Sequence, residues 1–321
     1  MSKSETTIVT PAPSDKKQPG SKPRSIGTMA TSDPYNGQEL RRPKSTASDK
    51  AFATIAHIVL ILWVIIVVAP MLWTLMTSFK STSEIFASPF NLPAKWGFDN
   101  YVNAWETAGI GKYFFNTVLV VGSALFLVML LGAMCAYVLA RFKFPGSRLI
   151  YYALLGGLMV PVFLAIVPLF FILQNFGLLN TLPGLVVTYV SFALPFTVFF
   201  LYAFFRSLPY EISEAAQIDG AGDWRTFFSI MLPMAKPGLA SVAIFNFLGL
   251  WNQFLLPVAL NTNEDNYVLS QGLARFASAA GYDVDFGALF AAVVITVLPV
   301  LVAYIIFQRQ LQGSVSQGTM K

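Results

Sequence analysis

The sequence predicts an all-α, polytopic membrane protein with six transmembrane helices. Its 321 residues are 55% hydrophobic and only 12% charged, against about 25% charged residues in soluble domains. Six apolar runs are long enough to cross a hydrocarbon core of about 30 Å, which takes roughly 20 helical residues. The runs cover residues 54–78, 115–140, 150–174, 184–205, 237–260 and 287–308. None contains Asp, Glu, Lys or Arg, as expected of true spans, because a mid-membrane charge costs about 2.5–3.5 kcal/mol.

The N-terminal segment differs from the rest in composition. Residues 1–50 are rich in Ser, Thr, Pro, Lys and Gly and lack apolar periodicity, which predicts a disordered tail, because such a segment buries too little apolar surface to offset chain entropy. Residues 51–321 are expected to form one transmembrane domain. The first apolar run begins only at residue 54, which argues against a signal peptide.

The distribution of Lys and Arg predicts the orientation. The tail, the loop at 141–149, the segment at 206–236 and the C-terminal end together carry 17 of these residues, and the opposite loops carry 4. The side richer in Lys and Arg is expected to be cytoplasmic. Both termini are therefore predicted to lie inside the cell.

Several chemical functions are disfavoured by what the sequence lacks. The single cysteine, Cys135, lies in an apolar run, and His57 is the only histidine, which leaves little for a zinc site or a nucleophile–histidine pair. No G-x-x-x-x-G-K-[ST] phosphate loop occurs, and no RNA-binding signature accompanies the basic residues. We therefore expect no enzyme, no metal, no cofactor bound by this chain and no nucleic-acid partner.

Uncharged polar residues in the fifth run are candidates for a substrate path. Asn246, Asn252 and Gln253 carry amides, which can donate to and accept from the hydroxyls of a neutral polyol without burying charge. Hydrogen bonding between helices is the alternative, worth about 0.6–2 kcal/mol, and it is favoured for any single one of these residues. Prolines occur inside most of the runs and predict kinks that either shape a path or only serve packing.

The segment 208–233 is the longest amphipathic stretch of the chain, with Glu211, Glu214, Asp219 and Asp223 in it. Pro209 suits the first turn of a helix, and an apolar stripe of Ile212, Ala215, Ala216 and Ile218 follows, ended by Gly220, which tolerates positive φ. Asp223 can cap a second helix that ends at Pro233. Two short cytoplasmic helices around a glycine turn suggest a docking element.

The same segment resembles the EAA loop of ABC-importer permeases. The matching residues are Glu214-Ala215-Ala216, Gly220 and Ile230-x-Leu232-Pro233. The flanking Trp251-Asn252-Gln253-Phe254 is similar to the carbohydrate, maltose-permease-like branch, in which Glu often stands at position 253. The resemblance covers roughly residues 54–321. It assigns ATPase docking to eight residues: Glu214, Ala215, Ala216, Asp219, Gly220, Ile230, Leu232 and Pro233.

The resemblance implies a type I ABC-importer permease in a bacterial or archaeal cell membrane. Such a chain forms half of the translocation path of a sugar or oligosaccharide importer. The implied partners are a second related permease chain, two ABC ATPase subunits that hydrolyse the ATP, and an extracytoplasmic sugar-binding protein. An ABC permease for another small polar solute is the nearest alternative. An ion-coupled secondary transporter would normally need an intramembrane carboxylate, and a membrane-embedded enzyme would need a nucleophile, a metal set or an acid–base pair.

Overall fold

The computed structural model describes residues 47–278 and 285–318, and these residues form helices and turns without strands. Most of the predicted tail lies outside the described residues. The chain divides into two units, and the boundary between them lies at residues 61 and 62, inside α1 (Ala47–Thr77). The prediction of an all-α protein is confirmed.

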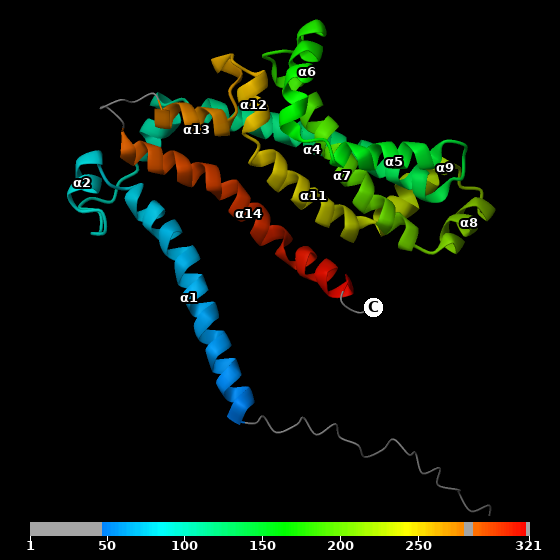
Figure 1. The fold of residues 1–321 in the computed structure, drawn as a ribbon, viewed down its shortest axis with the longest axis horizontal. Coiled ribbons are helices and arrows are strands. Elements are labelled where there is room, and N and C mark those ends of the chain that lie inside the picture. The colour runs from blue at the N-terminus through cyan, green and yellow to red at the C-terminus, as the bar shows by residue number, and fades with distance from the viewer. Residues whose placement is uncertain (1–46, 279–284, 319–321) are drawn as a thin grey trace, which may run out of the picture. The chain divides into compact units, whose positions relative to one another are not determined.

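Four helices are long and apolar enough to cross a membrane: α1, α4 (Ile110–Arg141), α7 (Leu182–Ser207) and α14 (Phe286–Gly318) (Figure 1). Two further spans arise only if each of two bent helix pairs counts as one. In the first pair, α5 (Ser147–Leu158) and α6 (Val162–Asn175) meet at 107°. The second pair joins residues 223–234 to α11 (Lys236–Trp251) at 76°. This gives up to six spans, as the six apolar runs predict.

The third and fifth apolar runs are broken helices rather than single straight ones. The third run breaks at residues 159–161, where Pro161 immediately precedes α6. The fifth run breaks at residues 252–254, and α12 (Leu255–Leu260) follows. The prolines at 70, 168, 195 and 299 lie inside α1, α6, α7 and α14 respectively.

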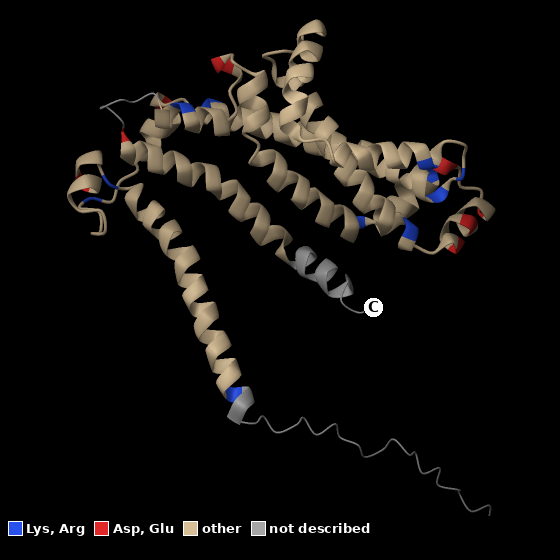
Figure 2. Ribbon diagram, viewed as in Figure 1, with Lys and Arg blue, Asp and Glu red and all other residues tan. Residues whose placement is uncertain are grey.

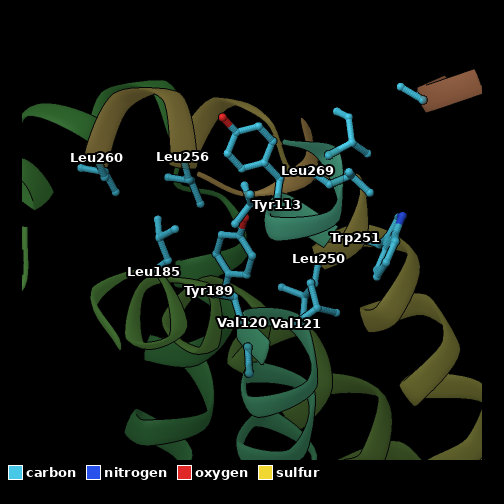
Figure 3. Packing of buried hydrophobic residues seen from close by; sticks show 14 of the residues in the cluster. Tyr113, Val120, Val121, Leu185, Tyr189, Leu250, Trp251, Leu256, Leu260 and Leu269 are labelled. Atoms are coloured by element: carbon cyan, nitrogen blue, oxygen red, sulfur yellow. The ribbon is translucent and has the colours of Figure 1, made fainter. Parts of the chain in front are cut away.

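The interior of the second unit is built on the packing of α4 against α7. Gly132 of α4 lies so close to Thr197 of α7 that a β-carbon at 132 would stand 2.5 Å from the threonine methyl carbon. Small residues at such contacts let membrane helices approach closely. Near the N-terminal end of α4, Tyr113, Tyr189 and Leu269 belong to one buried apolar cluster (Figure 3).

The segment between α1 and α4 contains a buried cation. It consists of α2 (Thr82–Ala87), α3 (Asp99–Val102) and the π-helical turn η1 (Asn103–Thr107). Lys80 is fully buried, and its ammonium donates to the carbonyls of Ser88 and Pro89 at 3.0 and 3.1 Å. A buried charge is tolerated when it is well hydrogen-bonded.

The loop at residues 261–286 is predicted to be external; its part at residues 261–278, called the external loop below, contains the 3-10 turn η3 (Glu264–Asn266) and the helix α13 (Leu269–Ser278). Arg275 forms an ion pair with Glu264, and Lys112 forms one with Asp265 at 2.5 Å. The hydrogen bond and positive charge of Lys112 lower the pKa of Asp265 below its usual value. The loop is thereby tied to the N-terminal end of α4.

Candidate functional site

The docking loop, residues 208–233, folds as the pair of short helices that its sequence predicts. The first helix is α8 (Tyr210–Ile218). The second begins with α9 (Asp223–Arg225), continues as the π-helical turn η2 (Thr226–Met231) and ends with α10 (Leu232–Met234). The second helix therefore runs one residue past Pro233, where the sequence predicts its end.

The turn between the two helices depends on glycine. Gly220 has φ +79°, which L side chains adopt only with strain. The amide of Ala221 donates to the carbonyl of Ala216 at 2.9 Å, which closes the end of α8. Gly222, rather than Asp223, occupies the N-cap of the second helix, and the Asp223 side chain makes no capping bond. The predicted cap was wrong by one residue.

One face of the docking loop is held by the transmembrane helices. Phe227 and Met231 are buried in an apolar cluster that α4 and α7 also build, and Ile212 is partly buried against it. The matching motif residues Ile230 and Leu232 are partly buried there as well. Ala216 is buried as well, outside this cluster. These motif positions therefore seat the loop on the membrane domain.

The opposite face is free. Glu214, Ala215, Asp219 and Gly220 are exposed, as is Pro233. Ile218 is 86% exposed and Trp224 67% exposed. The predicted apolar stripe therefore splits, because Ile212 and Ala216 face inward while Ala215 and Ile218 face outward.

Within the described part of the chain, no ion pair or hydrogen bond engages the carboxylate of Glu214. Charged residues gather around this loop and around α13 and the turn before it (Figure 2). The free face thus combines an unpaired carboxylate, small residues and exposed apolar side chains, which suits a protein partner with a basic cleft.

Sequence reasoning missed the contact that fixes the start of α8. The count of Lys and Arg includes Arg141 in the loop at 141–149, but the sequence pattern indicates no contact between Arg141 and Tyr210. In the structure the guanidinium carbon of Arg141 lies 4.4 Å from the centre of the Tyr210 ring. The available signal was a basic residue in the last turn of a long helix, a position from which Arg can reach free carbonyls.

The candidate path residues lie in two different surroundings. A pocket of about 240 Å³ between α7 and the segment from α11 to α12 is lined by Asn246 and Gln253 together with aromatic residues. The aromatic lining consists of Tyr189, Phe192, Phe196 and Phe245. Asn252 is exposed outside this lining, and its amide donates to the carbonyl of Leu248 in its own helix at 2.9 Å.

Asn246 also acts as a link between helices. It is 5% exposed, and its amide nitrogen donates to the hydroxyl of Thr197 at 2.8 Å. Asn246 therefore has the role that the sequence analysis gives as the alternative to substrate contact, a hydrogen bond between two helices. Gln253 is half-buried, and no hydrogen bond engages its side chain within the described residues, so its amide is available at the pocket.

No group of three or more His, Cys, Asp or Glu side chains that could hold a metal ion occurs among residues 47–278 and 285–318. The chemistry that the described surfaces support is hydrogen bonding, apolar contact and docking.

Comparison with known proteins relates the chain to transport systems. Residues 128–317 match the family described as binding-protein-dependent transport system inner membrane component. The chain is 70% identical over 277 residues to the diacetylchitobiose uptake system permease protein NgcG of Streptomyces coelicolor, covering 86% of this chain and 92% of that protein. It is 32% identical over 252 residues to the trehalose transport system permease protein SugB of Mycobacterium tuberculosis, covering 78% and 92%.

A solved structure shares the fold. A chain of a bacterial ABC transporter involved in the import of the acidic polysaccharide alginate superimposes with a TM-score of 0.75 at 20% identity. The match covers 83% of this chain and 99% of that one.

Proposed function

The chain belongs to the family of binding-protein-dependent transport system inner membrane components, and we propose that it forms half of the translocation path of an ATP-driven oligosaccharide importer. It is a permease subunit of an ABC sugar transporter and not an enzyme. The proposed substrate is a short neutral oligosaccharide such as N,N′-diacetylchitobiose, the disaccharide in the name of the relative that is 70% identical.

The observation that carries the coupling half of the proposal is the free face of the docking loop. Its inner face is seated on α4 and α7, so a force applied to the loop reaches the transmembrane helices. Its outer face presents the unpaired Glu214 to the solvent. We assign the eight motif residues to ATPase docking in two groups, with the exposed ones in contact with the partner and Ala216, Ile230 and Leu232 seating the loop.

The remaining assembly follows the same proposal. ATP is bound and hydrolysed by two partner ATPase subunits, since the chain has no phosphate loop. A second related permease supplies the other half of the path, and an extracytoplasmic binding protein delivers the sugar. Movement of the docking loops rocks the spans and switches the path between its two openings.

The pocket between α7 and α11 supports a sugar as the substrate. Aromatic rings and amides recur in ligand sites that are mostly apolar with a few placed polar groups. The six apolar runs contain no charged residue, which favours a neutral solute over a charged one and leaves no intramembrane carboxylate for ion coupling. We propose Gln253 as a hydrogen-bonding contact to the sugar, with Asn246 beside it; Asn252 lies outside this pocket.

The test is uptake into proteoliposomes that contain the chain with its partner permease, ATPase and binding protein. We expect accumulation of N,N′-diacetylchitobiose that requires ATP inside the vesicles and is unaffected by collapsing proton and sodium gradients. Gln253→Ala should raise the sugar concentration for half-maximal uptake, whereas Ser241→Ala, in α11 but outside the pocket lining, should not. Gradient-driven uptake by the chain alone would contradict the proposal.

A further inference from the structure

The helix α4 differs from the other long helices in being uninterrupted. Its 32 residues contain no proline, whereas α1, α6, α7 and α14 each have one inside. At 1.5 Å per residue α4 is about 48 Å long, against a hydrocarbon core of about 30 Å. A helix of this length is longer than the hydrocarbon core by about 18 Å, enough to extend past it at both ends.

The external end of α4 is bonded to the external loop. The amide of Asn116 donates to the carbonyls of Asp265 and Tyr267 at 3.0 and 2.9 Å. In return, the backbone amide of Leu269 donates to the hydroxyl of Thr117 at 2.7 Å in a buried position. These bonds run in both directions between helix and loop, so the loop moves with this end of α4.

The cytoplasmic end of α4 is bonded to the docking loop in the same reciprocal way. Nη2 of Arg141 donates to the carbonyl of Leu208 at 2.8 Å, and Nη1 donates to that of Pro209 at 3.4 Å. The guanidinium lies over the ring of Tyr210, whose hydroxyl donates to the carbonyl of Ala140 at 3.1 Å. Only a planar, forked cation can bond two carbonyls and stack on a ring at once.

A second contact, one turn earlier on α4, reaches the other docking helix. The ring of Tyr137 packs on Phe227 at 5.0 Å and on Phe205 of α7 at 5.6 Å between centroids. The end of α4 therefore holds both helices of the docking loop, without being covalently adjacent to either.

The two helices that are covalently continuous with the docking loop are less suited to carry its movement straight across the membrane. Pro195 removes one backbone hydrogen bond from the middle of α7. On the other side of the loop, α11 begins after a 76° bend and has 16 residues. The unbroken route from the docking loop to the external side is α4.

We propose that Arg141 is the positioning residue that couples the docking loop to α4, and that α4 carries the movement of the loop to the external loop. This inference rests on the proposed function, because the movement originates in the ATPase subunits. It predicts that the nucleotide state of the ATPase subunits alters the exposure of the external loop only when the contact between Arg141 and the docking loop is intact.

The experiment uses the importer complex purified with its partner permease and ATPases. The chain carries Cys135→Ala to remove its own thiol and Ala277→Cys as a reporter on an exposed position of α13. The labelling rate of the reporter by a maleimide is measured with and without MgATP plus vanadate. We expect the trapped state to change this rate by about fivefold or more, the low end of typical coupling factors.

In this background Arg141→Met should abolish the change in labelling rate while ATPase co-purification and vanadate trapping persist. Arg148→Met is the matched control, because it removes the same charge from an exposed residue that makes no hydrogen bond, ion pair or ring contact with the docking loop; the change should survive there. Tyr210→Phe, which removes only one hydrogen bond, should reduce the change, and it provides the test if Arg141→Met fails to accumulate.

A full response in both Arg141→Met and Tyr210→Phe would overturn the proposal. Loss of ATPase co-purification in both would also overturn it, because these residues would then shape the docking surface rather than transmit its movement. If the unsubstituted background binds no vanadate with MgATP, the proposed function itself fails and this inference falls with it.

Discussion

The side-chain amide of Asn246 in α11 donates a hydrogen bond to the hydroxyl of Thr197 in α7, with 2.8 Å between the two atoms. The same hydroxyl donates to the carbonyl of Ala193, one turn earlier in α7. The two bonds together fix how α11 lies against α7 beside the pocket. The contact is therefore expected to contribute to stability as well as to the shape of the path.

A double-mutant cycle measures this contribution. Asn246→Ala and Thr197→Val, singly and together, should show a coupling energy of about 0.6–2 kcal/mol, the usual range for hydrogen bonds between membrane helices. The measurement is unfolding of the purified chain in mixed micelles. Effects that add to within about 0.3 kcal/mol would show that the two residues act independently.

Charge reversal at Glu214 tests the docking face. Glu214→Lys places an ammonium where the partner is expected to present basic groups, so ATPase co-purification and sugar uptake should both be lost. Because residue 214 is exposed, the level of the chain in the membrane should stay normal. Glu106→Lys makes the same charge change at an exposed position outside the docking loop and serves as the control. Normal ATPase binding by the Glu214→Lys variant would contradict the assignment of Glu214 to ATPase docking.

Substitution of Gly220 separates backbone strain from crowding. A β-carbon at 220 would meet no atom within 4 Å, yet φ is +79°, so Gly220→Val should cost about 1–2 kcal/mol through strain alone. We expect the two docking helices to be misaligned and uptake to fall. Gly220→Asn, which tolerates this conformation, should restore much of the activity.

The matched control for that change is Gly222→Ser, two residues away. Gly222 has φ −70° and is equally uncrowded, and Ser is a favoured N-cap residue. Sugar uptake by the Gly222→Ser variant should equal that of the unsubstituted chain. Equal losses at 220 and 222 would indicate that the turn tolerates no side chain at all, for reasons other than φ.

The orientation is tested by labelling. In a Cys135→Ala chain, Ser147→Cys should react with a membrane-impermeant maleimide only from the cytoplasmic side, and Ser83→Cys only from the outside. The ratio of 17 to 4 in Lys and Arg motivates this expectation. Reaction of both positions from one face would refute the six-span arrangement.

The sequence predicted where the apolar runs lie, but not where the helices within them break. Hydropathy averages composition over a window, so residues 150–174 qualified as one span although the helix breaks at 159–161. Pro161 was the available signal, because proline lacks the amide that would continue the helix. Whether such a proline bends a helix or separates two depends on neighbouring packing, which composition does not record.

The docking loop was likewise predictable only in part. The turn was predictable, because only glycine adopts positive φ without strain. Which side of α8 faces the membrane domain was not predictable. Ile212 and Ala216 are four residues apart and share one side of the helix, while Ile218 lies about 240° around the helix from Ile212, so the apolar residues do not all lie on one side. Similarly, Asn246 and Gln253 line one pocket while Asn252 does not. Spacing along a helix shows which residues share a side. It shows which side faces the pocket or the membrane domain only when the position of one of those residues is known.

The buried ammonium of Lys80 has a consequence for biosynthesis. In the orientation that the Lys and Arg count predicts, Lys80 is one of the four Lys and Arg residues that are translocated to the outer side, yet in the folded protein it is 0% exposed. Its bonds to the carbonyls of Ser88 and Pro89 can form only after both residues have followed it across the membrane. The charges that decide orientation during insertion are thus not the same set that the mature surface displays.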